Sequence, residues 1–201
     1  MTSLQDSYDL LKLSRIELEN VIRTQLLENP ALELDDSGPS ESSDSKKKQD
    51  TGGSLVPDVR IERNGQLYVV RLNDEGRRLR VSSLYERMAG QKIKVDGHVD
   101  YPYFIEKARA AKWFIKAVEL RQSTMLKVTE SIFRFQRELL QRGLNHIRPL
   151  TLRDIAADIR LPESTITSAA ANKWVETPHA IFALDWFFSA PKPTTVEKPR
   201  R

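Results

Sequence analysis

The feature that most constrains the fold is a long stretch without helix breakers. No Gly or Pro occurs between Pro102 and Gly143, and apolar or small residues recur there every three or four positions. This is the period of one face of an α-helix. Asp100 can cap the helix at its start, and Pro102 is tolerated in the first turn. The stretch predicts one helix of roughly 40 residues, far longer than the average helix. The recurring residues are Phe104, Ala108, Ala111, Ile115, Val118, Met125, Val128, Ile132, Phe135 and Leu139.

A coiled coil is one interpretation of so long a helix. Its apolar face, however, carries Phe104 and Phe135, with Trp113, Phe114 and Phe133 beside it, where a leucine zipper would repeat Leu. We therefore favour a helix that bears a domain at each end.

The same segment is strongly basic, although the net charge of the whole chain is only +4. An excess of cations on one helix attracts a phosphate backbone, but it is equally typical of a solvated helix face. The basic residues are Lys107, Arg109, Lys112, Lys116, Arg121, Lys127, Arg134, Arg137, Arg142 and Arg148, against Glu106, Glu119, Glu130 and Glu138.

A helix-turn-helix pattern follows Gly143. Thr151–Asp154 resembles a capping box, Arg160–Pro162 forms the turn, and a second helix extends from Glu163 or Ser164 to Lys173. Any small helical hairpin can imitate this pattern, but short polar side chains on a recognition helix suit contacts with bases or phosphates. We expect DNA contacts from Arg153, Ser164, Thr165, Thr167, Ser168, Asn172 and Lys173, and a buried face formed by Leu152, Ile155, Ala156, Ile159, Ile166 and Ala169 or Ala170.

The N-terminal third contains two smaller elements. Residues 4–33 predict a helical hairpin that restarts at the capping box Ser14–Glu17; it is too small to bury its own apolar face and must dock elsewhere. Residues 34–56 are rich in Ser, Gly and charge, and are expected to be a linker. Residues 58–72 alternate around Asn64-Gly65 and predict a β-hairpin, packed on a short helix at Ser82–Met88 or on the long helix.

No pattern of a catalytic or metal site occurs. Cysteine is absent, the three histidines are far apart in sequence, and no phosphate-binding or dinucleotide-binding loop is present. We expect a protein that is not an enzyme and binds no cofactor or metal. We expect no signal peptide or membrane span, which favours a soluble protein of the cytoplasm. The aromatic segment 180–188 is expected to pack on the helix-turn-helix, and the basic tail 191–201 to be disordered.

Three stretches together resemble the sigma-54 family of bacterial transcription initiation factors. LQDSYDLLKLSRIELENVIRTQLLENPALE (4–33) is similar to the regulatory region of that family, and PDVRIERNGQLYVVRLNDEGRRLRVSSLY (57–85) to the later part of its polymerase-binding domain. Residues 103–188 resemble the family's extra-long helix and helix-turn-helix, most specifically in RPLTLRDIAADI, EST and NKW.

The chain departs from the family pattern in several places. We expect the first half of the polymerase-binding domain to be missing between Glu33 and Pro57, and the C-terminal domain with its promoter-reading signature box to be absent. Arg160 replaces the turn glycine. Ser168 stands where the family has an arginine, which removes the best candidate for a bidentate guanine contact of about 1–3 kcal/mol.

The resemblance implies a mainly α protein with an N-terminal helical hairpin, a small β-hairpin and helix element, and one extra-long helix leading into a helix-turn-helix. The expected parts are regulatory helices (4–33), linker (34–56), a remnant of the polymerase-binding domain (57–99), the DNA-binding domain (100–190) and the tail. The implied partners are core RNA polymerase, double-stranded promoter DNA and an activator ATPase. The chain is then either an initiation factor or a competitor that binds these partners without initiating transcription. The expected activator surface comprises Leu11, Leu13, Leu18, Leu26 and Leu27.

Overall fold

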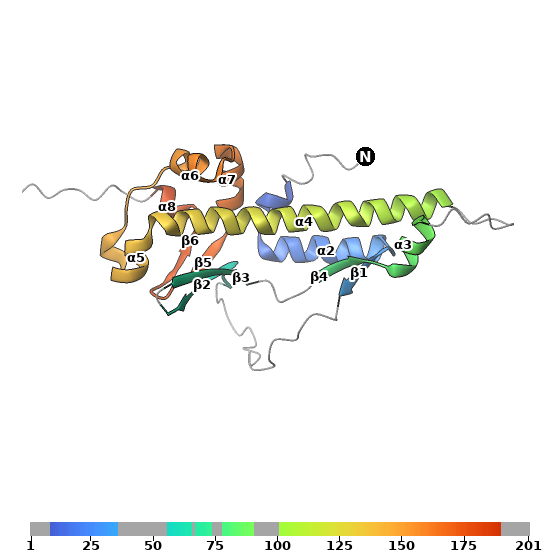
Figure 1. The fold of residues 1–201 in the computed structure, drawn as a ribbon, viewed down its shortest axis with the longest axis horizontal. Helices are drawn as coiled ribbons and strands as arrows, with labels where there is room; N and C mark the ends of the chain where they lie inside the picture. The colour runs from blue at the N-terminus through green and yellow to red at the C-terminus, as the bar shows by residue number, and fades with distance from the viewer. Residues whose placement is uncertain (1–8, 36–55, 66, 74–77, 91–100, 190–201) are drawn as a thin grey trace, which may run out of the picture. The chain divides into compact units, whose positions relative to one another are not determined.

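The computed structural model describes residues 9–35, 56–65, 67–73, 78–90 and 101–189, without the side chain of Tyr101 (Figure 1). The predicted tail and nearly all of the predicted linker lie outside these residues. The described chain forms two compact units, one from residues up to 54 and 74–121, the other from 55–73 and 122 onward. We call them unit 1 and unit 2. The prediction of a mainly α protein is confirmed.

Helix α4 (Tyr101–Phe135) is the long helix predicted from the sequence, and it contributes to both units. It has 35 residues, and the helix does not continue unbroken to Gly143 as expected. Gln136 interrupts it, and a separate helix α5 (Arg137–Arg142) follows. The interruption has no Gly or Pro, so sequence patterns gave no signal for it.

Unit 1 is built on the first part of α4. Helix α2 (Arg15–Glu28) begins at the predicted capping box, in which Ser14 and Glu17 bond each other's backbone N–H groups. Strand β1 (Leu32–Asp35) pairs antiparallel with β4 (Arg78–Val81), and α3 (Ser83–Gly90) follows. The buried core of the unit comprises Leu10, Leu18, Ala31, Leu32, Ala111, Phe114, Ala117 and Val118.

Unit 2 contains the predicted β-hairpin, formed by β2 (Val59–Asn64) and β3 (Leu67–Leu72). Its strands join β5 (Trp174–Glu176) and β6 (Ile181–Ala183) in a four-stranded sheet of order β3-β2-β5-β6. Strands β2 and β5 run parallel although 116 residues separate Arg60 from its partner Glu176. This sheet, like the β1–β4 pair, was not predicted.

The core of unit 2 joins the hairpin, the second part of α4 and the helix-turn-helix. Of the two expected supports for the hairpin, the structure has α4: Val59 and Ile61 share one hydrophobic cluster with Met125, Val128 and Ile132. The aromatic segment packs into the same cluster, as expected, through Leu184 and through Phe187 of α8 (Trp186–Ser189). The remaining core residues include Leu139, Leu140, Leu150, Ile155, Ile166, Ala169, Ala170 and Val175.

The segment 57–99, expected to be one element, is divided between the two units. The hairpin belongs to unit 2, whereas residues 78–90 belong to unit 1. The expected linker also begins too early, since Leu34 and Asp35 pair in β1 with Leu79 and Arg78. Strand pairing between distant segments, which local sequence patterns do not encode, accounts for both differences.

Candidate DNA-binding site and N-terminal helices

Helix α6 (Leu152–Ile159) begins with a reciprocal capping box. The hydroxyl oxygen of Thr151 accepts a hydrogen bond from the backbone N–H of Asp154 at 3.2 Å, and the Asp154 carboxylate accepts one from the backbone N–H of Thr151 at 2.9 Å. The hydrogen bonds from Thr151 favour the charged carboxylate and lower the pKa of Asp154 below its ordinary value of 3.8. The cap predicted from the sequence is confirmed.

The turn between the two helices is Arg160, Leu161 and Pro162, as predicted. Arg160 has φ 55° and ψ 44°, which is the left-handed region of backbone conformation. The Cβ atom that every residue except glycine carries disfavours this conformation, so glycine adopts it most readily. Helix α7 (Glu163–Ala170) follows directly after Pro162.

Helix α7 has one face in the core and one in solvent. Ile166, Ala169 and Ala170 are buried against the hydrophobic cluster of unit 2. Ser164 and Thr167 are exposed, and Ser168 is half-buried. These hydroxyls lie on the second helix of the motif, where a recognition helix presents its side chains to DNA. Of the other residues expected to contact DNA, Arg153 and Asn172 are exposed.

The expectation that Thr165 and Lys173 face outward is wrong. Thr165 is 7% exposed because α7 buries two adjacent rows of residues, and Thr165 lies one turn before Ala169. Lys173 is completely buried, and its ammonium group donates to the carbonyl of Ala171 at 2.9 Å. Because α7 ends at Ala170, helical spacing does not predict the direction of the Lys173 side chain.

A polar contact holds α6 against α4. The carboxylate of Asp158 accepts a hydrogen bond from the hydroxyl of Ser131 at 2.5 Å. One guanidinium nitrogen of Arg134, Nη1, donates to both carboxylate oxygens of Asp158, each at 3.0 Å. The Asp158 side chain is only 22% exposed, so it is partly shielded from solvent. Arg134 was expected among the cations available to phosphate, and the structure gives it this intramolecular partner.

A buried glutamine fixes the loop that leads into α6. The Gln136 side chain donates to the carbonyl of Arg148 at 2.7 Å and accepts from the backbone N–H of Arg148 at 2.9 Å. Gln136 has no exposed surface. Its amide therefore satisfies both main-chain groups of a residue only two positions before Leu150, which enters the core.

The hairpin and the strand after α7 are joined by Asp58. Its backbone N–H donates to the carbonyl of Trp174, and its carboxylate accepts from the backbone N–H of Trp174, both at 2.8 Å. Sequence analysis did not identify Asp58. Its partner lies more than 100 residues away, so no local spacing could indicate the pairing.

The N-terminal leucines do not form the single exposed surface that the sequence predicted. Leu11 and Leu18 are 4% and 5% exposed, and Leu13 and Leu26 pack partly against the core of unit 1. Their apolar face is covered by the first part of α4, which provides the docking that the sequence required. Leu27 alone among the five is fully available, at 83% exposed.

Ile16 is a second exposed apolar residue on α2, at 73% exposed, and sequence analysis missed it. It precedes Leu27 by about three helical turns, so the two side chains share one face of α2. The spacing of 11 residues between Ile16 and Leu27 indicates this shared face. The apolar stripe through Leu18, Ile22 and Leu26 lies on a different face of α2, which packs against the core.

Arg121 of α4 is buried at 3% exposed, although the sequence placed it among the cations available to phosphate. Its guanidinium donates to the carbonyls of Leu10 and Leu13, both at 3.0 Å. Residues 9–12 form a helical turn, and the last carbonyls of a helix lack partners within it. Arg121 therefore fastens the N-terminal segment to α4.

Within the ranges that the structure describes, no three His, Asp or Glu side chains are grouped so that they could hold a metal ion. In the same ranges, no helix has the length and apolar character needed to cross a membrane.

The fold and the site of unit 2 define a helix-turn-helix protein of the DNA-binding type. Residues 102–198 match the family model described as "Sigma-54, DNA binding domain", and residues 2–34 match "Sigma-54 factor, Activator interacting domain (AID)". The two matches together cover well over half of the chain. The chain belongs to the sigma-54 family.

Curated relatives agree with this assignment. The chain is 36% identical over 137 residues to the RNA polymerase sigma-54 factor of Pseudomonas aeruginosa, an alignment that covers 68% of this chain and 27% of that protein. It is 38% identical over 141 residues to the factor of Acinetobacter guillouiae, covering 70% and 29%. The chain thus aligns with less than a third of the length of these relatives.

A solved structure has a similar fold. It is the crystal structure of Aquifex aeolicus sigmaN bound to promoter DNA, with a TM-score of 0.51 and 22% sequence identity. The match covers 68% of this chain and 41% of that one.

Proposed function

We propose that this chain acts as a sigma-54-type transcription initiation factor. It binds core RNA polymerase, contacts double-stranded promoter DNA through α6 and α7, and depends on an activator ATPase. The observation that carries the proposal is the exposed hydroxyl row of α7, on a helix-turn-helix within the residues that match the family's DNA-binding domain.

The proposed DNA contacts comprise fewer residues than the sequence predicted. Arg153, Ser164, Thr167 and Asn172 are exposed, and Ser168 is half-buried; these five remain the proposed contacts. Thr165 and Lys173 act instead by packing the motif into unit 2. Short hydroxyl side chains favour phosphate contacts and single hydrogen bonds to bases over bidentate reading of guanine.

The proposed activator surface is the solvent face of α2. Ile16 and Leu27 are large apolar side chains exposed by 73% and 83% on a helix that matches the activator-interacting domain. Exposed apolar residues of this kind suit a protein partner. Leu11 and Leu18 are buried and Leu13 and Leu26 are partly buried, so these four contribute to packing and not to this surface.

A competitor of the full-length factor is the second candidate. Ser168 favours it, because a half-buried hydroxyl stands where the family resemblance leads us to expect arginine. Such a protein would hold polymerase or activator without placing them at a promoter.

One reconstitution separates the two candidates. The protein is combined with core polymerase, an activator and ATP on a promoter that a full-length sigma-54 factor uses. Transcript from this protein alone supports an initiation factor and contradicts the competitor. Inhibition of the full-length factor, with no transcript from this protein alone, supports the competitor and contradicts the initiation factor.

Docking of α7 is tested by Ser168→Arg. A restored guanidinium should tighten promoter binding about tenfold if α7 enters the major groove, since a bidentate guanine contact is worth about 1–3 kcal/mol. Arg153→Gln should weaken binding to all duplexes alike. A DNase footprint that is identical for wild type and Ser168→Arg would refute the docking of α7.

A further inference from the structure

The β2–β3 hairpin meets the chain directly after the second helix of the helix-turn-helix. Helix α7 ends at Ala170 and β5 begins at Trp174, so three residues separate them. Strand β2 pairs parallel with β5 inside unit 2, with Val59 opposite Val175 (Figure 1). A segment 116 residues earlier in the chain therefore holds the strand that follows α7.

Asp58 forms the joint between the hairpin and β5. Its backbone N–H donates to the carbonyl of Trp174, and its carboxylate accepts from the backbone N–H of Trp174, both at 2.8 Å. Asp58 is only 8% exposed, so water competes little for these bonds. A hydrogen bond to a carboxylate is also stronger than one between neutral groups. A single residue thus fixes both polar main-chain groups of Trp174.

The hairpin also shares its apolar core with α7. Val59 and Ile61 of β2 belong to the same hydrophobic cluster as Ile166 and Ala169 of α7. All four residues are at most 3% exposed. Side chains in a close-packed core resist displacement, because a shift opens voids or forces overlaps. The buried face of α7 therefore packs in a core to which the hairpin contributes.

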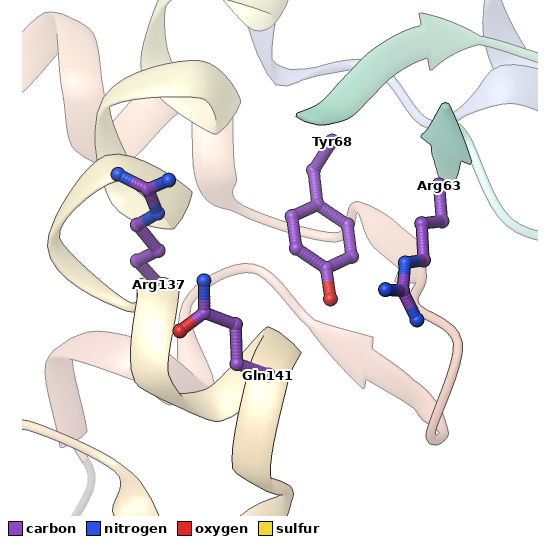
Figure 2. A pocket seen from close by; sticks show the side chains of 4 residues that line it. All are labelled: Arg63, Tyr68, Arg137 and Gln141. Atoms are coloured by element: carbon purple, nitrogen blue, oxygen red, sulfur yellow. The ribbon is translucent and has the colours of Figure 1, made fainter. Parts of the chain in front are cut away.

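The hairpin is fixed on α5 as well. The Tyr68 hydroxyl of β3 donates to the carbonyl of Leu140 at 2.8 Å, and Nε2 of His179, between β5 and β6, lies 3.0 Å from the same oxygen. Since a carbonyl oxygen only accepts, Nε2 donates here. Figure 2 shows Tyr68 between Arg63 of β2 and Gln141 of α5. Helix α5, the hairpin and the β5–β6 connection thus meet at one carbonyl oxygen.

The three residues that connect α7 to Trp174 are themselves constrained. Asn172 has φ 55°, in the left-handed region, and the buried Lys173 donates to the carbonyl of Ala171 at 2.9 Å. So short and constrained a connection has little freedom to absorb a shift of Trp174. The position of Trp174 therefore determines the position of the end of α7.

We propose that the β2–β3 hairpin sets the orientation of α7 for DNA binding, with Asp58 as the positioning residue. The hairpin acts through Trp174 and the shared core, without touching DNA. The orientation of α7 matters most for contacts with bases, because a base edge is read at one register whereas phosphates repeat along the duplex. This inference rests on the proposed DNA binding by α7, and its test uses the full chain.

The affinities of wild type and Asp58→Ala for a promoter duplex and for an unrelated duplex are measured by fluorescence anisotropy at fixed salt. We expect Asp58→Ala to bind the promoter duplex about tenfold more weakly, as for the loss of one base contact. Binding to the unrelated duplex should stay within about twofold of wild type, since it depends on phosphates. Asp58→Asn keeps an oxygen that accepts from the N–H of Trp174 and should recover most of the promoter affinity. An equal loss in Asp58→Asn contradicts positioning through this bond.

Leu72→Ala separates positioning from stability. Leu72 of β3 lies opposite Val59 and packs against the same core, so its truncation destabilises the hairpin but keeps the bonds of Asp58. It should lower the urea midpoint without changing promoter affinity. If Leu72→Ala and Asp58→Ala weaken promoter binding alike, affinity follows stability and the positioning role is wrong.

Arg71→Gln is the matched control for charge. It removes an exposed ion pair with Glu62 from the same hairpin and should leave both affinities unchanged. A tenfold loss in this variant would mean that the charge of the hairpin acts on DNA directly, which overturns the proposal.

The failure of this inference and that of the proposed function are distinguishable. If wild type shows no preference for the promoter duplex, the proposed promoter contact fails together with this inference. If wild type prefers it and Asp58→Ala binds it equally well, only the inference fails. Circular dichroism checks that each variant is folded. Should Asp58→Ala not fold, Asp58→Glu, which displaces the carboxylate by one methylene, takes its place with the same expected loss.

Discussion

At the scale of single residues, Arg160 shows most clearly how local strain and sequence are related. A non-glycine residue in the left-handed region carries a steric cost, and here it lies at the turn of the helix-turn-helix. We predict that Arg160→Gly stabilises the protein by about 0.5–1 kcal/mol, because relief of strain exceeds the extra entropy that glycine has in the unfolded chain. Urea unfolding measures the change.

Ala157→Gly is the matched control. Ala157 is an exposed residue inside α6, three positions before Arg160, where glycine should cost about 1 kcal/mol. If Arg160→Gly also lowers the urea midpoint, the left-handed conformation imposes no net strain on the arginine.

Asp154 gives a prediction for pH. Its pKa is depressed in the folded protein by the hydrogen bonds from Thr151, so the capping box stabilises α6 fully above the unfolded value of 3.8. This contribution is lost as pH falls below 3.8 through the folded value. The stability difference between wild type and Asp154→Asn should therefore be present at neutral pH and shrink in that acid window. A difference that stays constant down to the acid limit of folding would contradict this linkage.

At the scale of elements, the joint between α4 and α5 depends on Gln136. Gln136→Leu retains the apolar packing volume but leaves the N–H and C=O of Arg148 without their partner. We expect a loss of about 1–3 kcal/mol in the free energy of unfolding, because both main-chain groups lose a part-buried hydrogen bond. Chemical denaturation of the full chain is the measurement.

Gln141→Leu serves as the control for this joint. Gln141 is exposed on α5, so its replacement should change stability by no more than about 0.5 kcal/mol. Equal losses of stability for the two substitutions would show that the hydrogen bonds of Gln136 to Arg148 do not stabilise the protein.

At the scale of the whole molecule, the two hydrophobic clusters share no residue. We predict that Leu18→Ala, which removes a side chain 5% exposed in unit 1, costs about 2–4 kcal/mol and accelerates hydrogen exchange in α2, β1 and β4. Amides of α6 and α7 in unit 2 should keep their wild-type rates. Hydrogen-exchange mass spectrometry resolves the two sets of peptides.

Leu27→Ala tests the opposite role on the same helix. Its side chain is 83% exposed, so exchange in unit 1 should remain unchanged while binding to an activator ATPase weakens. Faster exchange throughout unit 2 in Leu18→Ala would mean that the two clusters unfold as one.

Local sequence patterns determined the elements whose causes are local. The capping boxes at Ser14 and Thr151, the hairpin around Gly65, the turn at Arg160 and the long helix all follow from hydrogen bonding or periodicity within a few residues. The same reasoning located α7 and most of its exposed hydroxyls, because a helix of known register divides into two faces.

Tertiary structure alone decided which polar and apolar groups were buried. Lys173 and Arg121 look like available cations, and Leu11 and Leu18 like a free apolar surface, until distant segments cover them. The parallel pairing of β2 with β5 and the Asp58 contact likewise join residues far apart in the chain. Their stabilising contacts form only after folding, so no spacing in the sequence could reveal them.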